Sequence, residues 1–185
     1  MNWRTPLVAI GLLLFSAVPS RADIILVPYL GQSWSGIIND AGGGYPTTYG
    51  VRAEWLMGIF GLGLDAAHTP DFLRESVRDS TLSTLMANVV VGGRLPEERG
   101  FRPYLTAGAG VLLYDLTALD GRGDSATDFG YNLGAGASVL FTRHVGAEID
   151  FRYFRNTKEF RLGGLDFPEE IVEYARWSGG VIFRF

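Results

Sequence analysis

Residues 173–185 read EYARWSGGVIFRF, and this stretch decides the fold. From Ala175 to Phe185 every second residue is apolar or small, whereas the residues between them include Arg176 and Arg184. Alternation with a period of two is typical of a β-strand that has one apolar face and one polar face. The segment is therefore predicted to be a half-buried strand, and the rest of the chain has to show which face is buried.

The same alternation recurs between clusters of glycine, proline and charged residues. We predict eight strands, at residues 24–32, 47–56, 61–68, 81–95, 101–116, 129–141, 145–156 and from the end of a loop at Glu170 to the C-terminus. Short connections (57–60, 96–100 and 142–144) alternate with longer ones (33–46, 69–80, 120–128 and 157–170). Strands of about 9–11 residues are long enough to cross a membrane at a tilt, and membrane barrels alternate short turns with long loops. The sequence therefore predicts an all-β protein, an eight-stranded antiparallel up-and-down transmembrane β-barrel.

In a membrane barrel the apolar face points outward and the polar face points inward. A soluble barrel of the lipocalin type would have the opposite orientation, and alternation alone does not separate the two. Three features favour the membrane: tyrosine and tryptophan cluster near strand ends, the polar face is rich in glycine, and the chain ends on phenylalanine. The inward charged residues are then expected to pair with one another, because unpaired buried charges are costly. They are Arg52, Glu54, Asp65, Arg94, Glu148, Asp150, Arg152, Arg176 and Arg184.

The first 22 residues are predicted to be a cleaved signal peptide. Arg4 precedes an apolar run from Leu7 to Val18, and Ser20 and Ala22 supply small residues before the cleavage point. An uncleaved anchor is the alternative, although the run is shorter than the roughly 20 residues of a membrane helix. Cleavage removes two of the 16 basic residues and none of the 20 acidic ones, so the barrel of residues 23–185 is acidic and is not expected to bind nucleic acid. The chain has no cysteine, which excludes disulfides and zinc–cysteine sites.

Three segments carry a resemblance to a known family: FRPYLTAGAGV (101–111), FGYNLGAGASV (129–139) and VGAEIDFRY (145–153). They resemble the opacity-type outer-membrane β-barrel family, which includes the OmpA-like and OmpX-like eight-stranded surface proteins. The resemblance covers residues 23–185 and implies a location in the cell outer membrane. It also implies contact with outer-membrane lipid and lipopolysaccharide, and insertion by the outer-membrane assembly machinery. The terminal residues VIFRF resemble the signal which that machinery recognises in this class, with Trp177, Val181, Phe183 and Phe185 on the apolar face.

The sequence predicts no enzyme, cofactor or metal site. Nucleophilic catalysis needs a serine beside a base, and His68, near the loop serines Ser76 and Ser80, is a weak candidate because no His–Ser pair like that of the lipid A deacylases is found on a lipid-facing strand. We expect a monomeric, non-enzymatic barrel that contributes to envelope structure or surface adhesion, with an extracellular ligand that the sequence does not identify. The alternatives are a small gated ion channel and a lipid-modifying enzyme, since fold alone does not fix function.

Overall fold

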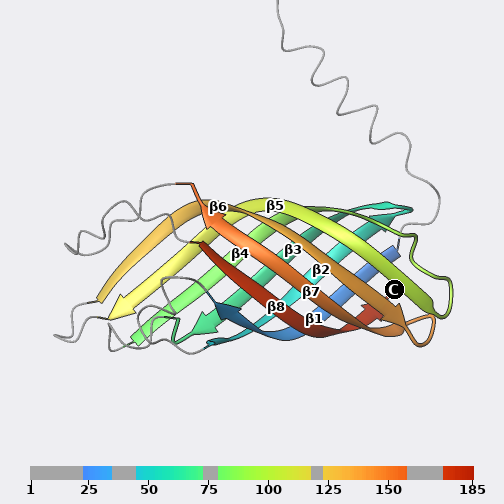
Figure 1. Ribbon diagram of the computed structural model, residues 1–185, viewed down its shortest axis with the longest axis horizontal. Coiled ribbons are helices and arrows are strands. Elements are labelled where there is room, and N and C mark those ends of the chain that lie inside the picture. Colours follow the sequence, from blue (N-terminus) through green and yellow to red (C-terminus); the bar gives the residue numbers. More distant parts are fainter. Residues whose placement is uncertain (1–22, 35–44, 73–78, 118–122, 158–172) are drawn as a thin grey trace, which may run out of the picture.

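The computed structural model describes residues 23–34, 45–72, 79–117, 123–157 and 173–185, which form a closed barrel (Figure 1). The strands are β1 (Asp23–Trp34), β2 (Thr47–Met57), β3 (Phe60–Pro70), β4 (Asp79–Gly92), β5 (Gly100–Thr117), β6 (Gly123–Leu140), β7 (Val145–Asn156) and β8 (Glu173–Arg184). Each strand is antiparallel to its neighbours, and β8 pairs with β1 to close the sheet. The eight-stranded antiparallel barrel that the alternation predicts is thus confirmed. Within the described ranges, no helix has the length and apolarity that crossing a membrane requires.

The two ends of the barrel differ in their connections. At the turn end, β2 joins β3, β4 joins β5 and β6 joins β7 through short connections, and Figure 1 shows that β1 begins at the same end as the C-terminus. The tightest turn is Gly58–Ile59, where Gly58 has a φ of 68°. A glycine with positive φ at the first central position is typical of a type II′ hairpin turn. The other four connections are at the opposite end, the loop end; three of them are longer, whereas the β5–β6 connection (118–122) is shorter than the β4–β5 connection (93–99), in contrast to the expected loop at 120–128.

Two strand boundaries differ from the sequence prediction by three residues or more. We expected a loop at 120–128, but β6 begins at Gly123 and its first residues pair with the end of β5. The β5–β6 hairpin is therefore 18 residues deep on each side, whereas β7 and β8 have 12 residues each. The prediction of a loop was wrong because residues 120–128 contain glycine and three aspartates, a composition that is usual for a turn. At the other end of the barrel β4 stops at Gly92, three residues before the predicted end at Leu95.

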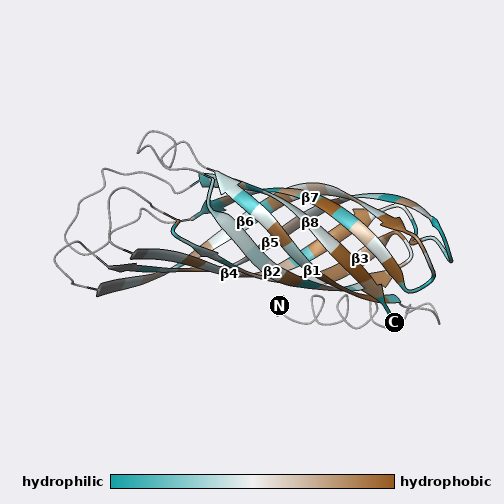
Figure 2. Cartoon of the chain, turned by 90° about the horizontal axis from the view of Figure 1, so that it is seen from below, coloured by the Kyte–Doolittle hydropathy of each residue, from teal (hydrophilic) through white to brown (hydrophobic). Residues whose placement is uncertain are grey.

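Alternate side chains point to opposite sides of the barrel wall. The outward side chains are mostly apolar and well exposed, among them Leu30 at 65%, Leu105 at 65% and Ile149 at 69%. Figure 2 shows apolar residues along the strands and hydrophilic residues at the connections of the turn end. Exposed aromatic side chains lie near both ends, such as Tyr49 toward the loops and Phe101 toward the turns, as in membrane barrels. The predicted outward direction of the apolar face is confirmed.

The interior is layered along the barrel axis. On the inward face of β8, Tyr174, Arg176 and Ile182 follow one another from the loop end to the turn end, and all three are buried. Tyr174 belongs to an apolar cluster with Phe72, Leu82, Met86, Leu112, Tyr114 and Phe154. Ile182 belongs to a second apolar cluster with Ile25, Val27, Leu56, Leu95 and Leu140. The buried charged residues of the interior lie between these loop-end and turn-end clusters, whereas buried hydroxyl groups such as those of Ser33, Thr48 and Thr69 are at the loop end.

Candidate functional site

Eight charged side chains are buried inside the barrel, and each is at most 5% exposed. We call them the interior charge network: Arg52, Glu54, Asp65, Arg102, Glu148, Asp150, Arg152 and Arg176. Four arginines face four carboxylates, so the formal charge of the network is zero. The net acidity of the chain therefore resides outside the barrel interior.

Arg52 of β2 is at the centre of the network and connects opposite walls. Its Nε donates to Asp65 Oδ2 of the adjacent β3 at 3.2 Å. Its Nη2 donates to Asp150 Oδ1 at 3.1 Å, and its Nη1 donates to Glu148. Both of these residues are on β7, which is separated from β2 by β1 and β8. Because charge-assisted hydrogen bonds are among the stronger ones, Arg52 holds two non-adjacent strands together across the lumen.

Asp65 of β3 collects more partners than any other carboxylate of the network. It accepts hydrogen bonds from Tyr29 Oη at 3.0 Å, from Arg176 Nη2 at 2.9 Å and from Arg52 Nε. The Nη1 of Arg152 lies 3.6 Å from Asp65 Oδ2. Arg152 also donates from Nε to Asp150 Oδ1 at 2.8 Å. Asp65 and Asp150 therefore share arginines and link the network into one unit.

Two tyrosines fill the lumen beside the network, and each lies against a glycine on a neighbouring strand. Tyr29 pairs in register with Gly50, and Tyr104 pairs with Gly136. A Cβ atom at Gly50 would lie 2.5 Å from the Tyr29 ring, and one at Gly136 would lie 2.4 Å from the Tyr104 ring. Glycine at these positions thus lets each ring lie flat along the inner wall. The Tyr104 hydroxyl donates to an aspartate of the network at 2.8 Å, as Tyr29 does.

The turn-side part of the network is more loosely paired. Arg102 Nη1 lies 3.9 Å from Glu54 Oε2, at the limit of an ion pair. Both carboxylate oxygens of Glu54, and both terminal nitrogens of Arg102, have no hydrogen-bond partner within the described protein. Buried polar groups without a protein partner are commonly satisfied by ordered water. The unpartnered atoms of Glu54 and Arg102 are therefore suited to binding water.

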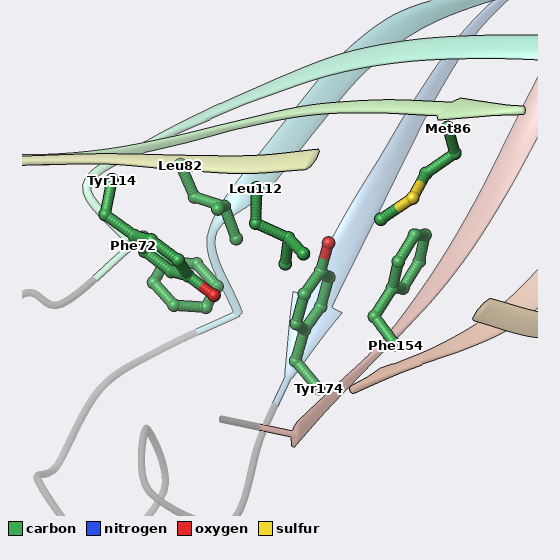
Figure 3. Close-up of a cluster of buried hydrophobic side chains, with 7 residues drawn as sticks. All are labelled: Phe72, Leu82, Met86, Leu112, Tyr114, Phe154 and Tyr174. Carbon is green, nitrogen blue, oxygen red and sulfur yellow. The ribbon is translucent and has the colours of Figure 1, made fainter. Parts of the chain in front are cut away.

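The loop-end cluster closes the lumen on the outer side (Figure 3). The rings of Phe154 and Tyr174 stack with centroids 4.6 Å apart and an interplanar angle of 1°. Phe72 meets Tyr174 edge-on at 5.6 Å. Figure 3 shows Leu112 and Met86 directed toward the same stack. An eight-stranded barrel is just wide enough for its side chains to fill, and here they do.

The structure places the sequence-predicted charges in three environments. Seven of the nine are in the interior charge network, as expected: Arg52, Glu54, Asp65, Glu148, Asp150, Arg152 and Arg176. The prediction for Arg94 is wrong. Because β4 ends at Gly92, the alternation does not continue, and Arg94 is exposed in the β4–β5 connection while Leu95 turns inward. Arg184 is at the turn-end rim, where it donates to Asp23 at 2.8 and 2.9 Å.

Arg102 is the member of the network that sequence reasoning missed. The signal was present, because Arg102 and Tyr104 share one face of the predicted strand 101–116 while Phe101 and Leu105 share the other. The structure shows that Arg102 is fully buried. With Arg102 included and Arg94 and Arg184 outside, positive and negative charges balance in the interior.

The structure also shows a His–Ser pair on the lipid-facing wall, where the sequence revealed none. His68 of β3 and Ser83 of β4 are register partners on the outward face, and His68 Nδ1 lies 2.8 Å from Ser83 Oγ. The sequence did not show this pair because the residues are 15 positions apart on two strands whose register was unknown. The loop serine Ser76 lies outside the described residues, and Ser80 is buried.

The four apolar residues of the proposed assembly signal are on the outward face of the C-terminal strand. Trp177, Val181, Phe183 and Phe185 are between 41% and 75% exposed. In a membrane this row of side chains faces lipid. The strand that carries this row, β8, pairs with β1 to close the barrel.

Comparison with known proteins identifies the family. Residues 7–185 match the family described as "Outer membrane protein beta-barrel domain". Among solved structures, Neisserial surface protein A (NspA) is similar with a TM-score of 0.65 and 16% identity, over 89% of this chain and 97% of that one. The N-terminal β-barrel domain of Pseudomonas aeruginosa OprF gives a TM-score of 0.57 and 18% identity, over 88% and 97% of the two chains.

A third similar structure is Ail, the attachment invasion locus protein of Yersinia pestis, in complex with the heparin analogue sucrose octasulfate. Its TM-score is 0.55 and its identity 18%, over 89% of this chain and 98% of that one. At these identities the likeness concerns the fold. A comparison with curated protein sequences gave no match. The family match spans nearly the whole chain and agrees with the outward apolar wall, so the protein is located in the outer membrane. The chain belongs to the outer membrane protein β-barrel domain family.

Proposed function

We propose that this protein is a non-enzymatic, non-conducting barrel that contributes to envelope structure and presents its four surface loops for interaction. The observation that carries this proposal is the filled lumen. A neutral network of eight buried charges lies between two apolar clusters, and Arg52 ties β2 to β7 across the axis. A rigid, closed barrel of this kind is suited to anchoring loops rather than to transport.

Planar-bilayer recording tests the closed lumen. We expect the purified barrel to give no conductance steps in concentrated potassium chloride over a wide voltage range. A classical porin in the same bilayers serves as the positive control. The substitution Phe154→Ala removes one ring of the stacked Phe154–Tyr174 pair and leaves the charge network unchanged. It therefore gives a variant whose loop-end cluster closes the lumen less completely. Discrete openings of the wild-type protein would refute the proposal.

A small gated ion channel is the second candidate function. It is favoured by the polar atoms of Glu54 and Arg102 that lack partners within the described protein, because such groups could accommodate water or a small ion. The apolar clusters at both ends oppose this alternative. If the barrel conducts, the substitution Glu54→Gln should alter its cation–anion selectivity. The selectivity of a leak around the barrel would not change.

The loops are proposed to provide the surface for an extracellular partner. Ail, a structural relative, was solved in complex with a heparin analogue. The longest loop of the present chain, residues 158–172, contains two basic and four acidic residues, which does not favour a sulfated polysaccharide. A deletion strain complemented with either the full barrel or a barrel with shortened loops separates the two roles. We expect that both versions of the protein restore detergent resistance and that only the full barrel restores adhesion.

We also propose that the protein is exported by a cleaved signal peptide, residues 1–22, and inserted as a monomer by the outer-membrane assembly machinery. The small residues Ser20 and Ala22 and the outward row that ends at Phe185 support these steps. The intact mass of the protein from outer membranes should correspond to a chain that begins at Asp23. A chain that retains Met1 would refute the cleavage.

A further inference from the structure

The outward wall has a hollow near the loop end. Its volume is about 1080 Å³, and it extends over β8, β1, β2, β3 and β4. Small outward residues form its floor, including Pro28, Ala66 and Gly179, whereas Leu30 and Leu85 stand beside them and are 65% and 51% exposed. The volume is at the upper limit of pockets that hold small molecules, about 300–1,000 Å³. The hollow is therefore large enough for a hydrocarbon chain.

One side of this hollow carries the polar pair His68–Ser83. The pair is half-buried, and the Tyr49 ring lies beside His68 with the ring centroids 5.3 Å apart. The outward surface of β3 is otherwise apolar, with Leu62, Leu64 and Ala66 preceding His68. Within the described residues the Nε2 atom of His68 has no hydrogen-bond partner, so it remains available to a ligand.

The depth of the pair in the membrane follows from its position in the strand. His68 is two residues from the end of β3 at Pro70, on the loop side. In outer-membrane barrels the long loops face the outside, so the pair lies at the outer leaflet. Tyrosines such as Tyr49 mark the level where hydrocarbon meets the polar layer. The ester groups that join acyl chains to a lipid headgroup are at the same level.

We propose that the hollow binds an acyl chain of a lipopolysaccharide molecule of the outer leaflet, with His68 and Ser83 hydrogen-bonding to the ester group of that chain. The hollow is part of the lipid-facing surface, and its small side chains let an acyl chain lie against the barrel. The histidine and serine supply both a donor and an acceptor, which a neighbouring apolar wall lacks. This site differs from the loops and does not depend on what they bind.

The same pair is not arranged for hydrolysis. No carboxylate of the described residues hydrogen-bonds to His68 to orient its ring, as a third group does in serine hydrolases. Ser83 is on β4, which is hydrogen-bonded to β3 and β5, so the main-chain N–H groups around it are engaged in the sheet. An oxyanion requires free donors of this kind. The geometry thus supports binding of the ester group without its cleavage.

Native mass spectrometry of the barrel, released from detergent after incubation with lipopolysaccharide or with phosphatidylethanolamine, tests the proposal. We expect the wild-type barrel to retain lipopolysaccharide in preference to phosphatidylethanolamine. Gly179→Leu should fill the hollow and fold normally, because the nearest atom to a Cβ there is 3.9 Å away. It and His68→Phe should each reduce retention about fivefold, the factor that corresponds to roughly one hydrogen bond or a comparable contact. Ala135→Leu, an outward exposed position on β6 outside the hollow, is the matched control and should not change retention.

Three results would overturn the inference: equal retention by Gly179→Leu and Ala135→Leu, a preference for phosphatidylethanolamine, or release of a free fatty acid from the added lipopolysaccharide. The last result would identify the pair as a catalytic site. All variants are first compared by heat-modifiable gel migration, so that only folded barrels enter the measurement. Conductance in planar bilayers would refute the closed lumen and leave the lipid site intact, which keeps the two proposals separable.

Discussion

The substitution Asp65→Asn tests whether the interior charge network stabilises the barrel. It retains the shape of the side chain and removes one negative charge, so four arginines would face three carboxylates. Arg52 retains Glu148 and Asp150, and Arg152 retains Asp150. The ion pair that the structure shows for Arg176 is with Asp65, at 2.9 Å. The main effect of the substitution is therefore to leave the charge of Arg176, which is 1% exposed, without its carboxylate.

The size of the loss follows from burial. Removing one partner of a buried ion pair typically costs about 3–5 kcal/mol, since the remaining charge is neither hydrated nor paired. The m-value of urea unfolding is typically about 1–3 kcal/mol per molar, so the midpoint should fall by about 1 M or more. If the free arginine causes the loss, Arg176→Met in the same chain should restore part of the stability. We expect an interaction energy of about 2 kcal/mol from the double-mutant cycle.

The measurement is equilibrium urea unfolding in detergent micelles, followed by tryptophan fluorescence and by gel migration without heating. Glu173→Gln is the matched control. It breaks the Arg155–Glu173 pair, whose side chains are 37% and 43% exposed, and should cost about 0.2–1 kcal/mol. Equal midpoints for wild type and Asp65→Asn would refute the view that the network is a paired, dehydrated structural element. A double variant no more stable than the single one would show that the loss does not come from Arg176.

Three further predictions concern the packing, the boundary and the end of the chain. Gly136→Ala places a Cβ 2.4 Å from the Tyr104 ring and should cost about 1–3 kcal/mol in the same unfolding assay. Arg102→Ala removes the hydrogen bond to the Gly93 carbonyl and the long ion pair to Glu54, so it should cost about 1–3 kcal/mol. Arg94→Ala at its exposed position should change the stability by no more than about 0.5 kcal/mol. Similar losses for the two variants would contradict their different placement. Deletion of Phe185 should reduce the barrel recovered from outer membranes while refolding in detergent stays close to wild type, and parallel losses would argue against an assembly signal.

Much of this architecture could be predicted from the alternation of side chains alone. The alternation correctly predicted that Arg52, Asp65 and Asp150 are on the inward face, because each of their strands is long enough to show several periods. The prediction was wrong for Arg94, because the alternation was continued for one more period beyond the end of β4. Two apolar residues, Met86 and Val90, occupy the polar face of that strand. They are buried inside the barrel, and Met86 belongs to the loop-end cluster.

The sequence could not predict contacts that depend on register or on distance across the lumen. Arg52 meets Glu148 and Asp150 only because β2 and β7 face each other in the closed barrel. The His68–Ser83 pair depends on how β3 and β4 are aligned, and a shift by one residue would have turned one of the two side chains inward. Such pairings become visible when strand order and alignment are known together.

The depth of the β5–β6 hairpin affects how the outer surface of the cell is built. At about 3.3 Å per residue, 18 paired residues extend roughly 59 Å, and at a tilt near 40° they rise about 45 Å, compared with a hydrocarbon layer of about 30 Å. The paired ends of β5 and β6, Thr117 and Gly123, thus lie well above the acyl chains on a hydrogen-bonded stem. An antibody raised against the intact bacterium would meet the hydrogen-bonded ends of these two strands, and sequence variation there would change its recognition without disturbing the wall beneath.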